Sequence, residues 1–247
     1  MDLPRFSSPP LAGPIAFRFA GRARDLFTGD GVIFFLLLIS FFGIPWAIQR
    51  GLRWFVSNVD PIHGARARFV GGVGPLWASF GAVLALAVLQ QFNIVIAALT
   101  SEHPAVGAVL TILWAVLMQV LGTLNGFLIT RWECANVESP SGGRLAFSGG
   151  FWTWLGWQLL LLVSMLTIVG WAWVSVAQLR WVTRHVRSSS HEGRFSGTGL
   201  QMLWRGLVLA LGCAGLVTMP VTVCWFVRWL VSQTSGEPRE SAYAYSR

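Results

Sequence analysis

The side chains best suited to chemistry are few and scattered in this 247-residue chain. Its four histidines lie apart, without the paired spacing that a zinc-type site needs. They are His63, His103, His185 and His191. His185 and His191 stand near Glu192 and could meet a metal in a folded loop, but we favour a solvated basic loop. We therefore expect no metal site and no cofactor.

The acids and cysteines give no sign of catalysis either. None of the ten acids lies inside the long apolar stretches, where a proton-driven carrier or an intramembrane enzyme needs ionisable or nucleophilic groups. Cys213 and Cys224 fall inside the last stretch, and small packing residues are the simpler interpretation of them. We expect no catalytic residue and a protein that is not an enzyme.

Amide side chains gather in the second and third apolar stretches. Two interpretations are open: they bond between two neighbouring helices, which we favour, or they line a small hydrophilic path. The residues of this polar intramembrane cluster are Gln90, Gln91, Asn93, Gln119 and Asn125.

A short basic-aromatic motif recurs four times, each time before an apolar stretch. Three copies read Arg-Phe-x-Gly, and the fourth, Phe147-Ser148-Gly149, has its arginine displaced to Arg144. The three complete copies are Arg18-Phe19-Ala20-Gly21, Arg68-Phe69-Val70-Gly71 and Arg194-Phe195-Ser196-Gly197. The stretches end in four Arg-Trp dipeptides: Arg53-Trp54, Arg131-Trp132, Arg180-Trp181 and Arg228-Trp229.

The spacing of these motifs predicts a fourfold internal repeat. The distance from Phe to the closing Arg is 34, 62, 33 and 33 positions. Two connections even share text, since Asn58-Val59-Asp60 matches Asn136-Val137-Glu138 at the same offset. Repeats at a constant period indicate a repeated architectural unit. We expect units at 18–59, 68–138, 144–190 and 194–234.

The motif residues are our candidates for a surface that binds lipid headgroups or a protein partner. We hypothesise that Gly supplies backbone freedom for a turn, that Phe inserts at the membrane interface, and that Arg holds a phosphate. Tryptophan near the ends of apolar stretches fits the same zone, because its amphipathic ring suits the headgroup level.

Composition points to a membrane. The chain is 54% hydrophobic and only 11% charged, whereas soluble domains carry about 25% charged residues. Five apolar stretches approach the roughly 20 residues of helix that cross a bilayer. They are Gly31–Gln49, Gly74–Leu99, Pro104–Thr130, Phe151–Val176 and Trp204–Val227.

We therefore expect an all-α, polytopic integral membrane protein with about five transmembrane helices. A single transmembrane domain would cover 18–234, between poorly ordered tails at 1–17 and 235–247. The second unit is about 28 residues longer than the others. This length predicts a helical hairpin that turns at Ser101-Glu102-His103-Pro104. Helix breakers stand at Gly43 with Pro45, at Gly170 and at Pro220.

Orientation remains open between two alternatives. Five simple crossings would place nine arginines on each side, so the positive-inside rule gives a tie. Re-entrant short units would instead bring every arginine-rich connection to one face, although short returning segments need shielding by protein.

The net charge of +8 results from eighteen arginines and ten acidic residues, and the arginines lie beside apolar stretches. No basic run reaches the length of a nucleic-acid arm, so we expect no nucleic-acid partner. The expected partner is a lipid bilayer with anionic headgroups, and a second membrane protein or a second copy of the chain is a further candidate.

The Phe-x-Gly entry, the text from Gly43 to Ala47 and the basic-aromatic segment through Arg53-Trp54 resemble the YjgN-like family of bacterial inner-membrane proteins. The likeness runs from Phe17 to about Trp229. This chain has Ile44 and Trp54 where a tyrosine is expected. The resemblance implies a multi-pass protein of the inner membrane, in a family of unknown function. We expect a scaffold or accessory subunit of a membrane complex, with a carrier or channel for a small solute or lipid as the alternative.

Overall fold

The computed structural model describes residues 15–22, 25, 40–61, 67–139, 143–167, 169–188, 191–215 and 218–238. His63, residues 31–39 of the first predicted apolar stretch and the outer parts of both predicted tails lie outside these residues. Strands β1 and β8 include residues 15–17 and 235–238 of the segments predicted as tails.

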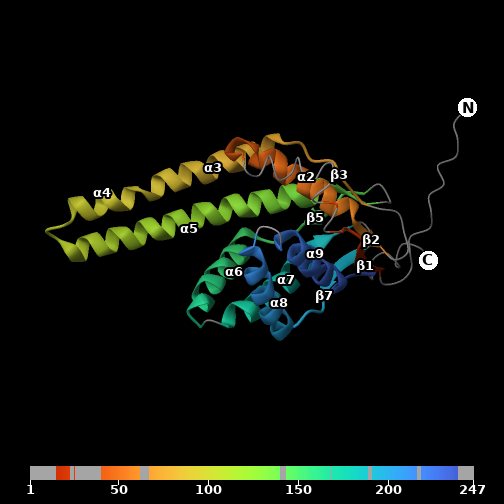
Figure 1. Ribbon diagram of the computed structural model, residues 1–247. Coiled ribbons are helices and arrows are strands. Elements are labelled where there is room, and N and C mark those ends of the chain that lie inside the picture. The colour runs from red at the N-terminus through yellow and green to blue at the C-terminus, as the bar shows by residue number, and fades with distance from the viewer. Residues whose placement is uncertain are drawn as a thin grey trace, which may run out of the picture.

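The chain forms four successive units, each of which begins and ends with a strand and has helices between the two (Figure 1). The first unit contains β1 (Ile15–Phe19), η2 (Phe41–Gly43), α2 (Ile44–Ser57) and β2 (Val59–Pro61). The second contains β3 (Arg68–Phe69), α3 (Gly74–Gln90), α4 (Phe92–Leu99), α5 (Pro104–Ala135) and β4 (Val137–Glu138). The third contains β5 (Ala146–Phe147), α6 (Phe151–Ser164), η3 (Met165–Thr167), α7 (Gly170–His185) and β6 (Val186–Arg187). The fourth contains β7 (His191–Phe195), α8 (Gly199–Cys213), α9 (Met219–Ser232) and β8 (Thr234–Pro238).

The strands form a six-stranded sheet in the order β2-β1-β8-β7-β6-β5 and a separate pair, β3-β4. Within each unit the first strand pairs antiparallel with the last, and the phenylalanine of the entry motif faces the first strand residue after the helices. These partners are Phe19↔Val59, Phe69↔Val137, Phe147↔Val186 and Phe195↔Thr234. Aromatic and β-branched residues favour such pairing. The β1–β8 and β6–β7 pairs then join neighbouring units.

The expectation of an all-α polytopic protein with about five transmembrane helices is wrong. The structure is mixed α/β, and within its described residues only two helical segments are long and apolar enough to cross a membrane. These are Gly74–Leu99 and Pro104–Ala135, each with a mean hydropathy of 2.1. The predicted stretches Phe151–Val176 and Trp204–Val227 are instead divided between two shorter helices each.

The predicted helix breakers explain this division. Pro45 and Pro220 occupy the first turn of α2 and α9, and α7 begins at Gly170. Proline is tolerated in a first turn, where its missing N–H costs no hydrogen bond, but it disrupts a helix interior. In the third and fourth units, two short helices therefore replace the expected single crossing, and the chain returns to the end from which it came.

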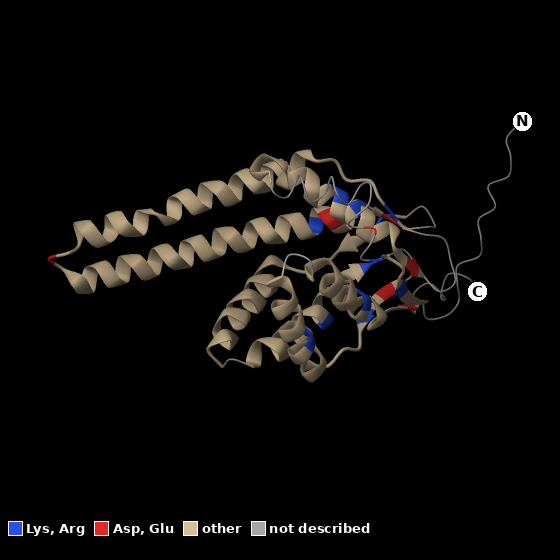
Figure 2. Ribbon diagram, in the orientation of Figure 1, with Lys and Arg blue, Asp and Glu red and all other residues tan. Residues whose placement is uncertain are grey.

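Because the helices return, the strands of all four units lie at one end of the molecule, here called the strand end. Most of the described charged residues gather there (Figure 2). Glu102 instead lies in the turn between α4 and α5, at the far tip. The equal division of arginines thus follows from the assumption of five crossings, which the fold does not support.

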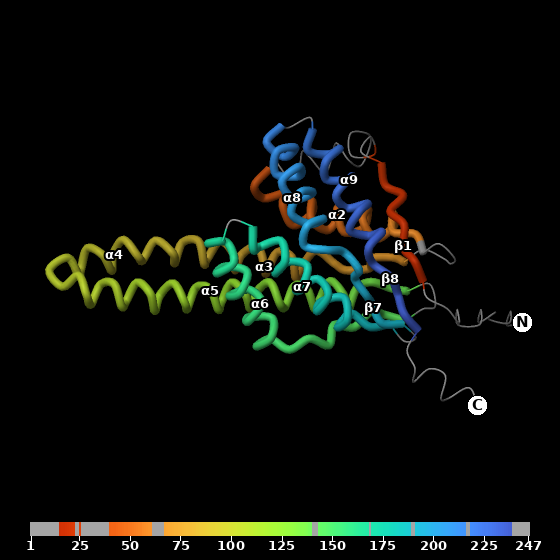
Figure 3. Tube along the Cα trace, turned by 90° about the horizontal axis from the view of Figure 1, so that it is seen from below, coloured from red at the N-terminus to blue at the C-terminus, as the bar shows by residue number. Residues whose placement is uncertain are grey.

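The second unit forms the predicted helical hairpin, which projects beyond the other helices (Figures 1 and 3). Helix α5 packs along both α3 and α4, with a break between those two at Gln91. In the most apolar window of each arm, 0% and 6% of residues are buried inside the protein. The fold therefore leaves a long apolar surface uncovered.

Candidate functional site

The four copies of the sequence motif adopt one local arrangement at the strand end. Each phenylalanine packs edge-on against the tryptophan of its own unit's Arg-Trp dipeptide, with ring centroids 5.4, 5.6, 5.8 and 6.3 Å apart. The phenylalanines are only 1%, 7%, 7% and 4% exposed. We call each group a Phe–Gly–Trp cluster: Phe19/Gly21/Trp54, Phe69/Gly71/Trp132, Phe147/Gly149/Trp181 and Phe195/Gly197/Trp229.

The backbone is equivalent in the four clusters as well. In each unit, the residue after the phenylalanine donates its N–H to the carbonyl of the residue just before the last strand of that unit. The N···O distance is 2.9 Å in all four units. The four bonds are Ala20–Asn58, Val70–Asn136, Ser148–His185 and Ser196–Gln233. Each bond extends the strand pairing by one residue and holds the end of the helix against the entry strand.

The glycine of each cluster is required by space. A Cβ added at Gly71 would lie 2.5 Å from Phe69 Cζ and 2.8 Å from Trp132 Cζ2, and the other three clusters are similarly crowded against the phenylalanine. None of the four glycines has φ in the left-handed region. The hypothesis that Gly supplies backbone freedom is therefore replaced by close approach of two aromatic rings.

The buried rings also alter the hypothesis for Phe. A phenylalanine that is at most 7% exposed inside the protein does not offer its ring to a membrane interface. Its burial instead stabilises the unit. In the fourth unit, Phe195 and Trp229 form a core with Val176 of the third unit.

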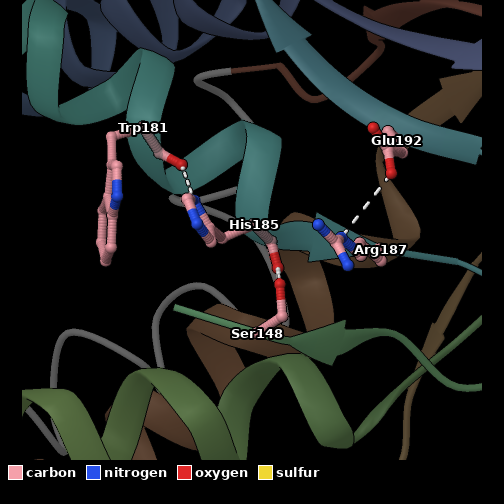
Figure 4. Close-up of polar contacts among 5 residues, drawn as sticks. All are labelled: Ser148, Trp181, His185, Arg187 and Glu192. Atoms are coloured by element: carbon pink, nitrogen blue, oxygen red, sulfur yellow. Dashed lines mark hydrogen bonds and ion pairs between the residues drawn. The ribbon is translucent and has the colours of Figure 1, made fainter. Parts of the chain in front are cut away.

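Polar side chains cap the closing helices. Asn58 and Asn136 each donate Nδ2–H to the carbonyl of the cluster's tryptophan at 2.8 Å. This role explains the shared Asn-Val-acid text, in which Asn ends the helix and the next two residues form the strand. In the third unit, His185 Nδ1 lies 2.7 Å from the Trp181 carbonyl, and the rings of these two residues lie 4.5 Å apart (Figure 4).

Two arginines of the Arg-Trp dipeptides connect neighbouring units. Arg180 Nη2 donates to the carbonyl of Gly197 at 2.8 Å, and Arg228 Nη2 donates to that of Gly21 at 3.2 Å. Gln49 Nε2 makes the corresponding bond to Gly71 at 2.8 Å. The third unit thus binds the fourth, the fourth binds the first, and the first binds the second.

The arginines of the entry motif face carboxylates. Arg194 pairs with Glu237, and Arg144 Nη2 lies 3.6 Å from Glu138 Oε1. Arg18 is paired in register with Asp60. Arg18, Arg144 and Arg194 are all exposed. A phosphate bound by Arg144 or Arg194 would therefore have to share the arginine with a carboxylate of this chain.

The five amides that were predicted to form an intramembrane cluster do not lie together. Asn125 Nδ2 donates to Ser79 Oγ at 3.0 Å and so joins α5 to α3, as the favoured interpretation expects. Gln91 lies at the break between α3 and α4 and is exposed. Asn93 Oδ1 is buried without a hydrogen-bond partner among the described residues.

Gln90 and Gln119 instead line a cavity of about 560 Å³ together with Gln158 of α6. Gln158 is not among the five amides predicted from the sequence. The available signal was that Gln158 is the only amide within the apolar stretch Phe151–Val176. Its approach to the other two depends on how α6 packs beside α5, which the sequence pattern does not show.

Arg205 stands at the start of the predicted stretch Trp204–Val227 and lies within α8. Its guanidinium carbon lies 4.3 Å from the ring centroid of Trp204 and 4.8 Å from that of Trp229. Such cation–π contacts offset part of the cost of placing a charge beside apolar helices.

Among the residues that the structure describes, no three His, Cys, Asp or Glu side chains gather as a metal site would require. No protein-family model, no curated protein and no solved structure matches the chain.

Proposed function

We propose that the protein is a non-enzymatic membrane protein that serves as a scaffold or accessory subunit of a membrane complex. The observation that carries this proposal is the exposed apolar hairpin of α3, α4 and α5. Water would solvate this surface poorly, whereas lipid chains cover it without loss.

The dimensions of the hairpin suit a bilayer. At about 1.5 Å per residue, arms of 26 and 32 residues extend roughly 39 and 48 Å, which exceeds a hydrocarbon core of about 30 Å. Glu102 and His103 at the tip and Arg131 at the base would lie outside the hydrocarbon. The hairpin would then cross the bilayer twice.

The shorter helices would enter the bilayer without crossing it. Helices α6, α8 and α9 have 14 or 15 residues, or roughly 21 to 23 Å, which is less than the hydrocarbon thickness. Leu166 in η3, which follows α6, and Leu211 in the last turn of α8 are 84% and 77% exposed. The strand end would lie at the headgroup level, where its arginines attract anionic lipids.

The resemblance to the YjgN-like family favours the inner membrane of a bacterium. By the positive-inside rule, the arginine-rich strand end would face the cytoplasm. The chain would be multi-pass through its single long hairpin.

Thiol labelling tests this topology. In a variant with Cys134, Cys213 and Cys224 replaced by Ala, we would introduce Glu102→Cys at the tip or Ser188→Cys at the strand end. An impermeant maleimide applied to right-side-out membranes should label only the tip, and inverted membranes should reverse the result. Labelling of both positions from one side would contradict a crossing hairpin.

The scaffold role needs a separate measurement. Membranes solubilised in mild detergent and separated on a native gel should show the chain in one discrete complex of constant composition. A chain that migrates alone, and that moves solute when reconstituted, would reject the scaffold.

A carrier or channel is the second candidate, and the cavity lined by three glutamines is the observation that favours it. In proteoliposomes, Gln119→Ala should then change the solute flux of a folded protein, whereas Gln91→Ala, which lies outside the cavity, should not. Absence of flux in the wild type would reject this candidate.

A further inference from the structure

The cavity of about 560 Å³ lies between the long hairpin and the third unit. Gln90 comes from α3, Gln119 and Thr123 come from α5, and Trp154 and Gln158 come from α6. The volume is in the range of small-molecule sites in proteins. Three different helices therefore contribute polar groups to one hollow beside the long hairpin.

The amides of this cavity are incompletely paired. Gln119 Nε2 has a long contact of 3.4 Å to Thr123 Oγ1. In the part of the chain that the structure describes, the side chains of Gln90 and Gln158 have no hydrogen-bond partner within the protein. An unpaired amide at hydrocarbon depth is unfavourable, so an occupant with its own donors or acceptors would stabilise the site.

The lining also limits the charge of the occupant. No charged side chain is among the described residues that line the cavity. An ion without a counter-charge would be poorly stabilised there. The occupant must therefore be uncharged.

The surroundings indicate an occupant with an apolar part. Trp154 offers an aromatic wall, and a Cβ added at Gly122 or Gly126 would meet nothing within 4 Å. Ile112 and Val116, which lie seven residues before Gln119 and Thr123 on the same face of α5, are 62% and 55% exposed. An acyl or similar chain can lie along this surface while the polar group occupies the hollow.

We propose that the cavity binds an uncharged, lipid-soluble molecule whose carbonyl or hydroxyl oxygens pair with Gln90, Gln119 and Gln158 and whose apolar chain lies along α5. The molecule enters sideways from the bilayer. This inference rests on the proposed membrane insertion of the hairpin and names a ligand class that the insertion alone does not require.

The probe for this site is a diacylglycerol that carries a diazirine near its glycerol group. Purified protein would be reconstituted in phosphatidylethanolamine–phosphatidylglycerol vesicles, irradiated and digested. We expect labelled peptides around Met118 of α5 and Trp154 of α6, and we expect unlabelled dioleoylglycerol to compete. Dioleoylphosphatidic acid, which carries a charge and is absent from the vesicles, should not compete at the same concentration.

Paired variants test the amides. The double variant Gln119→Leu with Gln158→Leu should lower labelling of these peptides at least about fivefold, since two lost hydrogen bonds at about 0.5–1.5 kcal/mol each correspond to roughly 5- to 150-fold. Gln91→Leu is the matched control, because this amide lies on the hairpin but outside the cavity, and its labelling should equal that of the wild type.

Three results would overturn the inference. They are equal labelling in the double variant, labelling spread evenly over α4 and α5, and displacement of the probe by a helix of a second copy of the chain. Resistance of each variant to carbonate extraction from membranes is measured in parallel. Loss of labelling from a protein that is still inserted concerns the cavity, whereas extraction of the wild type would reject membrane insertion itself.

Discussion

The second and fourth units share their contacts at the strand end but differ in the length of their helices. In both units the backbone bond that follows the phenylalanine is 2.9 Å long, and Phe and Trp meet edge-on. The helical arms have 26 and 32 residues in the second unit and 15 and 14 in the fourth. The cluster at the base thus accepts helices of about twofold different length.

The two units also differ in what surrounds their helices. In the fourth unit, an added Cβ at Gly206 would collide with Trp171 of the third unit, and Phe195 and Trp229 share a core with Val176. In the second unit, the arms beyond the base are almost wholly exposed. One motif therefore supports both a packed hairpin and an extended one, and the base must be stable without help from the tip.

Removal of the phenylalanine should have the largest effect on this shared base. Phe69→Ala and Phe195→Ala should each lower the free energy of unfolding by about 3–5 kcal/mol, because a buried ring is lost and a cavity remains. Thermal unfolding in detergent measures both. A much smaller effect in the second unit would show that its base is not equivalent to that of the fourth.

A charge in the long hairpin should distinguish the two kinds of helix. Leu113→Arg places a guanidinium near the middle of the proposed crossing, at a cost of about 2.5–3.5 kcal/mol on insertion scales, and should reduce the fraction of chain that resists carbonate extraction. Leu128→Arg, which lies near the base of α5, is the control and should have little effect. Equal loss for both positions would contradict a depth-dependent environment.

Added bulk at the cluster glycine should cost somewhat less. In Gly71→Ala and Gly197→Ala, the added Cβ would displace the Phe and Trp rings of the cluster. Each change should lower the free energy of unfolding by about 1–3 kcal/mol. Gly72→Ala is the matched control, because its Cβ would meet nothing within 4 Å. If Gly71→Ala unfolds at the temperature of the wild type, the close approach in the second unit has no energetic importance.

The exposed ion pairs should contribute least. Glu237→Gln and Glu138→Gln remove the partners of Arg194 and Arg144, whose side chains are both 62% exposed. Each change should cost about 0.2–1 kcal/mol at low salt and almost nothing at high salt, because solvent and ions screen such pairs. A larger loss that salt does not reduce would indicate that these arginines have a different structural role.

Much of the local structure was predictable. The recurring motifs, the hairpin turn at Ser101 to Pro104 and the breakers at Pro45, Gly170 and Pro220 all have direct counterparts in the fold. These features depend on residues that lie near each other in sequence: proline restricts its own turn of helix, and a long apolar run shows its length directly.

The strands were not predictable in the same way. They contain two to five residues, and partners such as Phe195 and Thr234 lie 39 positions apart. A strand this short has no readable alternation, and its stability comes from a partner that only the fold supplies. The expectation of helices alone therefore failed at these strands.

By itself, the sequence determined the repeated pattern of Phe, Gly, Arg and Trp, the apolar character of the helices and the greater length of the second unit. Only the tertiary structure decided that Phe is buried, that Gly is needed for space, that arginines join one unit to the next, and that Gln158 meets Gln90 and Gln119. Residue type and spacing act through nearby chain, whereas burial, close approach and shared cavities depend on segments that folding brings together.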